Sequence, residues 1–99
     1  MNLSRVIEAL LFSAHKPLST KEVVDLLHGA GAEDELSPNE FAKVRQAEVA
    51  AAIEQLKVEY IEHEHGFQLV EKAEGWQMTS DPKYAQCVRA LFPATKSAR

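Results

Sequence analysis

The spacing of the apolar residues changes once along this 99-residue chain, close to Gly66. Before that point the apolar residues recur at the spacing of one face of an amphipathic helix. After it they alternate with polar residues over 67–70 and 76–79, which is typical of half-buried strands. A chain of this length can enclose one modest core. The pattern therefore predicts a single α+β domain in which helices come first and a β-hairpin follows.

The main helices before this change are predicted over 3–14, 19–27 and about 47–61. The second begins with a capping box, because Ser19 is followed three residues later by Glu22. Ser37 followed by Pro38 is another helix start signal and predicts a short helix over 37–44. Its apolar positions do not continue into the frame of the longer helix, so we expect a bend between the two. One continuous helix is the alternative.

The last third of the chain is predicted to form a hairpin and a final helix. Ala73-Glu74-Gly75 is expected to connect the strands, because glycine can adopt the backbone angles of a bulged hairpin. Asp81-Pro82 then signals a helix start. The apolar face of this helix consists of Tyr84, Cys87, Val88 and Leu91. That face predicts that Cys87 packs in the core. We expect the domain to span 1–93 and 94–99 to form a flexible tail.

This order of elements is that of a winged helix, in which three to four helices pack on a small antiparallel hairpin called the wing. The helix at about 47–61 would then take the place of the recognition helix. The short helix at 37–44 would be an extra helical insertion before it. Such an insertion is tolerated because the cost of closing a loop rises only slowly with its length.

The charge of the chain argues against direct DNA binding. The chain carries 11 Lys and Arg against 15 Asp and Glu, and its formal net charge is −4. Over 46–74, the predicted recognition helix and first wing strand, two basic residues stand against seven acidic ones. A reader of DNA needs cations there to displace the counterions of the phosphates. The sequence therefore favours a protein-interaction module.

A winged-helix transcription regulator that binds duplex DNA remains the alternative. It would need a basic edge away from the wing, and the residues that could form one are Arg5, Lys16, Lys21, Lys43 and Arg45. A docking platform for a larger assembly is a third possibility.

No motif in the sequence indicates catalysis or a bound cofactor. His63 and His65 lack an identifiable third ligand, so no metal site is predicted. The single cysteine cannot close an internal disulfide, which favours a reducing cytoplasm. The apolar run at 9–12 is far shorter than the roughly 20 residues of a membrane span. The candidate contact residues for a protein partner are large and apolar: Phe67, Trp76, Met78, Tyr84 and Phe92. The alternative is that the aromatic residues fill the space between hairpin and helices.

Three stretches resemble the family of segregation and condensation protein B. The first is LSRVIEALLF at 3–12, followed by KPLS at 16–19. The second is FQLV at 67–70 with GWQMT at 75–79, and the third runs from Pro82-Lys83-Tyr84 through Val88 and Leu91. The match leaves out about 29–45, where this chain is longer than the family pattern.

This resemblance implies a function. Members of the family are winged-helix subunits of the bacterial chromosome-condensing complex, in which a kleisin subunit bridges the heads of the SMC ATPase. They usually carry two tandem winged helices and form homodimers. Only the first winged helix is present, so 94–99 would lead towards a second one. The resemblance attributes self-association mainly to the first domain and much of the kleisin contact to the second. Dimerisation is therefore the activity expected of this chain.

Overall fold

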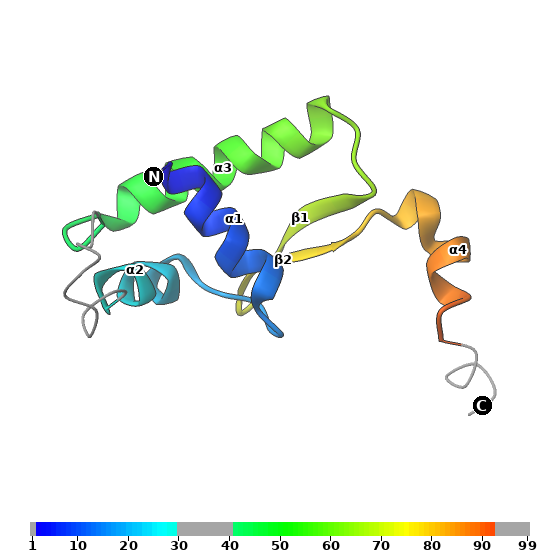
Figure 1. The fold of residues 1–99 in the computed structure, drawn as a ribbon, viewed down its shortest axis with the longest axis horizontal. Coiled ribbons are helices and arrows are strands. Elements are labelled where there is room, and N and C mark those ends of the chain that lie inside the picture. Colours follow the sequence, from blue (N-terminus) through cyan, green and yellow to red (C-terminus); the bar gives the residue numbers. More distant parts are fainter. Residues whose placement is uncertain (1, 30–40, 93–99) are drawn as a thin grey trace.

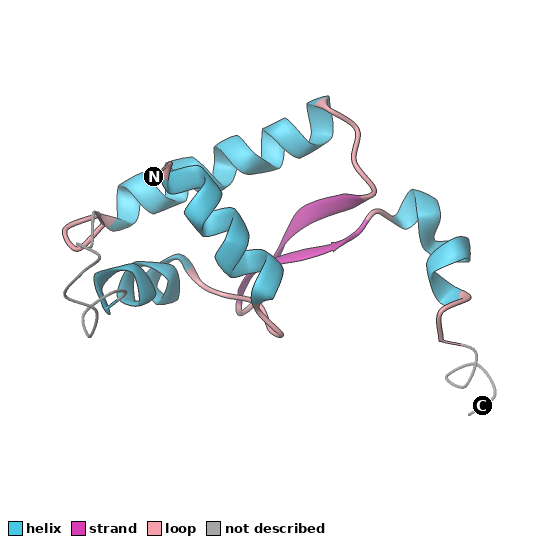
Figure 2. Cartoon of the chain, in the orientation of Figure 1, coloured by secondary structure: helices cyan, strands magenta, loops and turns pink. Residues whose placement is uncertain are grey.

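The computed structural model describes residues 2–29 and 41–92, and the elements appear in the expected order (Figures 1 and 2). The helices and strands are α1 (Leu3–Ser13), α2 (Thr20–Gly29), α3 (Gln46–Glu62), β1 (Phe67–Lys72), β2 (Gly75–Ser80), the short 3₁₀ helix η1 (Pro82–Tyr84) and α4 (Ala85–Arg89). The α+β class is confirmed, and the arrangement of three helices before an antiparallel hairpin is consistent with a winged helix.

The core forms around α3, against which α1, α2 and β1 all pack. One side of α3 is buried at the helical spacing expected from the sequence: Val49, Ala52, Ile53, Leu56 and Tyr60. The facing side chains from α1 and α2 are Ile7, Leu11, Val23 and Leu27, and Leu69 and Trp76 close the core from the hairpin. A short helix gains most of its stability from burying such a face rather than from intrinsic propensity.

The starts of α1 and α2 are fixed by side-chain caps. Asn2 accepts hydrogen bonds from the backbone N–H groups of Ser4 and Arg5. The predicted capping box of α2 is confirmed, because the Glu22 N–H donates to the Ser19 hydroxyl at 3.0 Å and the Ser19 N–H donates to the Glu22 carboxylate at 2.9 Å. The bond from the Ser19 backbone, and then Lys16 beside it, hold the pKa of Glu22 below its ordinary value.

The region before α3 differs from the prediction of a short helix over 37–44. Residues 30–40 lie outside the part of the chain that the structure describes. Residues 41–43 form a turn, and α3 starts at Gln46. Val44 is buried in the core, and its carbonyl lies 2.7 Å from the His28 ring nitrogen at the end of α2. The burial of Val44 and its contact with His28 therefore connect the turn to α2.

The hairpin pairs β1 with β2 in an antiparallel register that runs from Phe67 opposite Ser80 to Lys72 opposite Gly75. The connection is therefore two residues, Ala73 and Glu74, and the expected three-residue connection was wrong. Gly75 belongs to the strand, with a φ of +144° that side-chain-bearing residues rarely adopt.

Gly75 also allows a third segment to reach the hairpin. The backbone of Leu18 pairs with Trp76 on the outer side of β2, through N–O distances of 2.9 and 2.7 Å. A Cβ at Gly75 would lie 2.3 Å from the Leu18 carbonyl carbon. The absence of a side chain at this position is therefore what lets the α1–α2 connection lie on the sheet.

The C-terminal arm, defined as residues 82–92, contradicts the prediction that the last helix packs in the core. It extends from the end of β2 away from α1, α2 and α3 (Figure 1). Cys87 is exposed, so its predicted burial was wrong. The predicted last helix is divided into η1 and the five-residue α4, and Leu91 lies beyond the end of α4. Apolar spacing alone therefore did not show which surface would cover these residues. The expected tail at 94–99 lies outside the described residues.

Replacing Gly75 with alanine should destabilise the domain by about 2–3 kcal/mol, because the new Cβ meets rigid backbone and the φ is strained. Urea denaturation followed by circular dichroism measures this loss. Gly66→Ala is the matched control, since a Cβ there would meet nothing within 4 Å. Equal stability of the two variants would contradict the role assigned to Gly75.

Candidate protein interface

The solvent-facing side of α3 is acidic. Residues lining this side include Glu54, Glu59 and Glu62, together with Gln55 and Val58, and no Lys or Arg is among them. This is the surface that a DNA-reading winged helix would place in the major groove. Carboxylates in that position repel phosphates and release no counterions. The structure thus places the negative charge where the sequence argument expected it.

The proposed basic edge is largely neutralised within the chain. Arg5, Lys16, Lys21 and Arg45 each lie 2.8–3.4 Å from a carboxylate oxygen. Their partners are Glu8 and Glu59 for Arg5, and Glu22, Asp25 and Glu48 for the others. Exposed pairs of this kind add little to stability, but each puts a negative charge beside the cation that would have to meet a phosphate.

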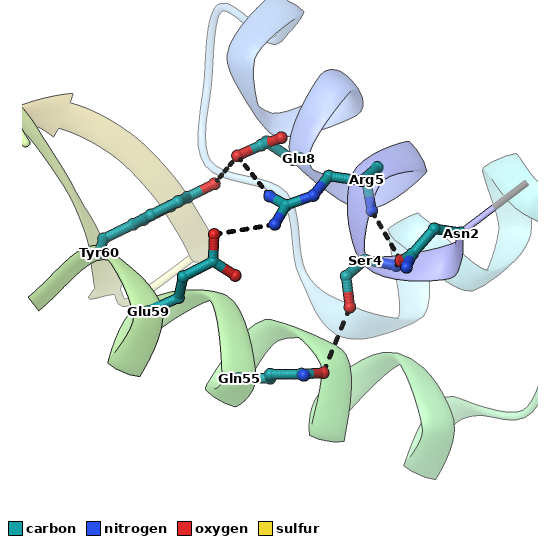
Figure 3. A network of polar contacts seen from close by, with 7 residues as sticks. All are labelled: Asn2, Ser4, Arg5, Glu8, Gln55, Glu59 and Tyr60. Carbon is teal, nitrogen blue, oxygen red and sulfur yellow. Dashed lines mark hydrogen bonds and ion pairs between the residues drawn. The ribbon is translucent and has the colours of Figure 1, made fainter. Parts of the chain in front are cut away.

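A polar network joins α1 to α3 (Figure 3). The Arg5 guanidinium donates to Glu59 at 2.8 Å and to Glu8 at 3.1 Å. The Tyr60 hydroxyl donates to the same Glu8 carboxylate at 2.5 Å. Burial of the phenol, and then its bond to Glu8, raise the pKa of Tyr60 well above its ordinary value. Tyr60 therefore remains a neutral donor that fixes the position of Glu8.

Beside this network lies the α1–hairpin hollow, a depression of about 280 Å³ between α1 and the hairpin. Its lining residues are Arg5, Glu8, Ala9, Phe12, Phe67 and Met78. The Phe12 side chain is 77% exposed, more than any other large apolar side chain in the described part of the chain. Two of the lining residues, Arg5 and Glu8, are charged, and the other four are apolar. Such a surface is typical of a protein contact.

Aromatic rings hold Phe67 in position in the lining of this hollow. Its ring makes an edge-to-face contact with Tyr60, with centroids 4.9 Å apart. The His65 ring stacks on Phe67, with centroids 4.7 Å apart and an interplanar angle of 5°, and it also makes an edge-to-face contact with Tyr60 at 5.5 Å. Phe67 is therefore partly exposed and yet firmly placed, because the core residue Tyr60 supports it.

The five candidate contact residues divide into two surfaces and the core. Trp76 is only 8% exposed, so it is part of the core, with the Lys57 ammonium over its ring at 5.6 Å. Phe67 and Met78 line the α1–hairpin hollow. Tyr84 and Phe92 lie on the C-terminal arm, where both are exposed. The aromatic residues thus do not act as one cluster.

Sequence reasoning missed Phe12 and misplaced Leu91. Phe12 lies off the apolar stripe of α1, which could have marked it as an exposed residue. Leu91, which is 74% exposed, belongs to a regular stripe and so was expected in the core. Only the direction in which the arm leaves β2 exposes it.

The described residues contain no group of three or more His, Cys, Asp and Glu side chains placed to hold a metal ion. The His65 ring stacks on Phe67. His63 caps the C-terminal end of α3, where its backbone N–H donates to the Glu59 carbonyl at 3.0 Å. Within the same residues, no helix combines the length and the apolar character needed to cross a membrane.

Comparison with known proteins identifies the family. The family model for the segregation and condensation complex subunit ScpB matches residues 5–99. The chain belongs to the ScpB family. Segregation and condensation protein B of Syntrophotalea carbinolica is 35% identical over 91 residues, which are 92% of this chain and 39% of that relative. The chain thus spans about two fifths of that ScpB protein.

Solved ScpB structures share the fold. The crystal structure of ScpB from Mycobacterium tuberculosis has a TM-score of 0.67 and 26% identity, and the match covers 98% of this chain and 50% of that one. A crystal structure of a dimer of the ScpB N-terminal domain complexed with ScpA peptide has a TM-score of 0.68 and 26% identity. That match covers 89% of this chain and 91% of the other. The likeness to the second structure therefore extends over nearly a whole isolated ScpB domain.

Replacing Tyr60 with phenylalanine should lower the free energy of unfolding by about 1–3 kcal/mol, because it leaves the Glu8 carboxylate without its phenol donor. Tyr84→Phe is the control, since this exposed phenol should contribute less than about 0.5 kcal/mol. Urea denaturation of both variants compares them. A Tyr60→Phe protein as stable as the wild type would show that the α1–α3 network does not support the fold.

Proposed function

We propose that this chain is the dimerising winged-helix domain of a non-enzymatic accessory subunit in a bacterial SMC–kleisin complex that condenses and segregates chromosomes. Family membership supports the role in segregation and condensation. Family membership also supports a cytoplasmic protein that reaches the nucleoid through this complex.

This proposal rests on one observation: on the described surface most cations are paired with carboxylates, while several large apolar side chains are exposed. Four of the five cations of the would-be basic edge are paired with carboxylates, whereas large apolar side chains on α1 and the C-terminal arm are exposed. A surface of this kind favours another protein over a nucleic acid.

The partners are a second copy of the chain and the kleisin subunit, and through the kleisin the SMC ATPase. The structural relative that matches nearly the whole domain is a dimer and is complexed with ScpA peptide. Because this chain has the same fold over 89% of its length, it has the scaffold on which both contacts can form. The second domain of the longer relatives is expected to add to kleisin binding in the whole protein.

Light scattering coupled to gel filtration tests self-association. The chain should elute as a dimer over a concentration range around 10 µM, a range in which a micromolar association is populated. A fluorescent peptide series that covers the ScpA of the same organism should contain at least one peptide that binds, with scrambled peptides as controls. A strict monomer throughout this range would remove the dimerisation claim.

Direct DNA binding is the competing function, and a salt titration separates the two. With a short duplex, the wild-type chain should bind no more tightly than about 100 µM at physiological salt. Glu54→Lys combined with Glu62→Lys should bind more tightly, because it converts the acidic side of α3 to a basic one. Micromolar binding by the wild type with a steep dependence on salt would favour the transcription regulator.

A further inference from the structure

The hairpin has one covered edge and one open edge. On the β2 side, Trp76 exchanges two backbone hydrogen bonds with Leu18, so this edge is covered. On the β1 side, the part of the chain that the structure describes places no strand and no backbone hydrogen bond from outside the hairpin. An open strand edge presents a row of unpaired N–H and C=O groups to any extended chain that approaches it.

The register of the hairpin determines which backbone groups of β1 point outward. Glu71 lies opposite Trp76, and the Trp76 N–H is already used by Leu18, so Glu71 and Trp76 are a non-hydrogen-bonded pair. Hydrogen-bonded and non-hydrogen-bonded pairs alternate along an antiparallel ladder. Leu69 and Phe67 therefore also direct their N–H and C=O groups away from β2.

The bond at the start of the hairpin has the same phase. The Asp81 N–H donates to the Gly66 carbonyl at 2.9 Å, one position before Phe67. Gly66, Gln68 and Val70 thus form their backbone bonds with the opposite strand. Every second residue of β1 is left with its polar backbone groups facing outward.

A groove of about 480 Å³ lies along this open edge, and we call it the β1-edge groove. Its lining includes residues 67–71 of β1 and, from the C-terminal half of α3, Lys57 and Ile61. The Ile61 side chain is 71% exposed, so the α3 wall offers an uncovered apolar contact. The groove therefore combines an open strand edge with a helix wall that can contact the side chains of an added strand.

The helix wall matches the side-chain spacing of a strand. Lys57 and Ile61 are four residues apart on α3, which is about 6 Å along the helix axis. Alternate residues of a strand are about 6.7 Å apart. β1 runs antiparallel to α3, because the Tyr60 ring contacts Phe67 whereas the Lys57 ammonium lies over Trp76, further along the hairpin. Successive α3-facing side chains of an added strand thus meet Ile61 and then Lys57.

Two charges in the groove are available to an occupant. Lys83 and Glu64 pair with each other at 3.6 Å, and the Asp81 carboxylate accepts from the Lys83 backbone N–H. Lys57 and Glu71 form no ion pair within the described residues. An occupant with a carboxylate beside Lys57 and a cation opposite Glu71 complements both charges.

We infer that the β1-edge groove binds an extended segment of a partner protein, which adds to the sheet antiparallel to β1. The segment carries a cation, a carboxylate and an apolar residue at alternate positions, in this order, facing Glu71, Lys57 and Ile61. Antiparallel pairing is chosen because it is the more stable of the two directions. Strand addition of this kind takes its affinity from the main chain and its specificity from alternate side chains.

This binding site goes beyond the proposed function, because it requires neither dimerisation nor the kleisin. β1 of a second copy does not match the required pattern. Read in the antiparallel direction, its α3-facing residues are Glu71, Leu69 and Phe67, which contain no cation and place the carboxylate first.

A nuclear magnetic resonance titration of the full chain tests the inference with a designed probe. The probe is a seven-residue peptide with lysine, glutamate and isoleucine at alternate positions between threonines. It should shift the amide signals of 67–71 with a dissociation constant below about 1 mM. A peptide with the order of the three residues reversed has the same composition and should bind at least about fivefold more weakly. No binding, or equal binding of both peptides, would overturn the inference.

Methylation of the probe backbone tests strand addition itself. The N–H of the central glutamate points to β1 in the inferred pairing, whereas the N–H groups of the neighbouring threonines point to solvent. N-methylation of the glutamate should therefore weaken binding about tenfold or more, and N-methylation of a threonine should have a much smaller effect. Equal effects at the two positions would contradict pairing with the edge of β1.

A charge swap tests the side-chain contact. Lys57→Glu should weaken the probe about tenfold, and a probe with lysine in place of its glutamate should restore most of the loss. Ile61→Asp should also weaken the probe. Val58→Asp is the matched control, because Val58 is exposed on α3 but lines a different part of the surface. Circular dichroism verifies that the variants remain folded, and failure of the swapped probe to restore binding would overturn the assigned register.

Hydrogen exchange of the free chain shows whether the edge is open in solution. The amide hydrogens of Phe67 and Glu71 should exchange faster than those of Gln68 and Val70, and saturating probe should slow only the first pair. Equal protection of all four in the free chain would mean that the edge is already covered and would overturn the inference. Self-association is measured separately by light scattering, so a monomeric chain that binds the probe removes the dimerisation claim and keeps this site.

Discussion

The buried stripe of α3 is the interaction on which the rest of the structure depends. Val49, Ile53 and Leu56 belong to the single core cluster, and α3 packs against α1, α2 and β1, so these elements are positioned relative to one helix. Removal of such side chains from a close-packed core is costly, because the surroundings fill the space only in part. The polar network of Arg5, Glu8, Glu59 and Tyr60 adds hydrogen bonds between α1 and α3 beside this core.

The same packing decides what the surface offers. With one side of α3 buried, its opposite side is exposed, and that side carries carboxylates where a DNA-binding relative of the fold would carry cations. Because Arg5 is paired with Glu8 and Glu59, negative charge lies beside it where a phosphate would have to bind. An order of elements typical of winged helices thus exposes carboxylates on α3, and this favours a protein over a nucleic acid as partner, because side chains rather than architecture determine what a surface binds.

Most of the fold could be predicted from local patterns. The starts of α2 and of the last helical segment follow from Ser19 with Glu22 and from Asp81, because capping is a local interaction. The candidate site was harder to predict. Of the five proposed contact residues, Trp76 is in the core and the other four are divided between the hollow and the arm. Apolar spacing shows that a face is to be covered, but it does not say whether the cover comes from the same chain.

The sequence by itself determined the helical and strand segments, the single core and the acidic character of α3, because each depends on residues that are near one another along the chain. Only the tertiary structure decided that Gly75 must admit the Leu18 backbone, that Phe12 lies beside Phe67, and that the arm leaves the body with its apolar face exposed. These features depend on the directions in which distant segments meet. Such directions are fixed by packing across the core, and no local pattern encodes them.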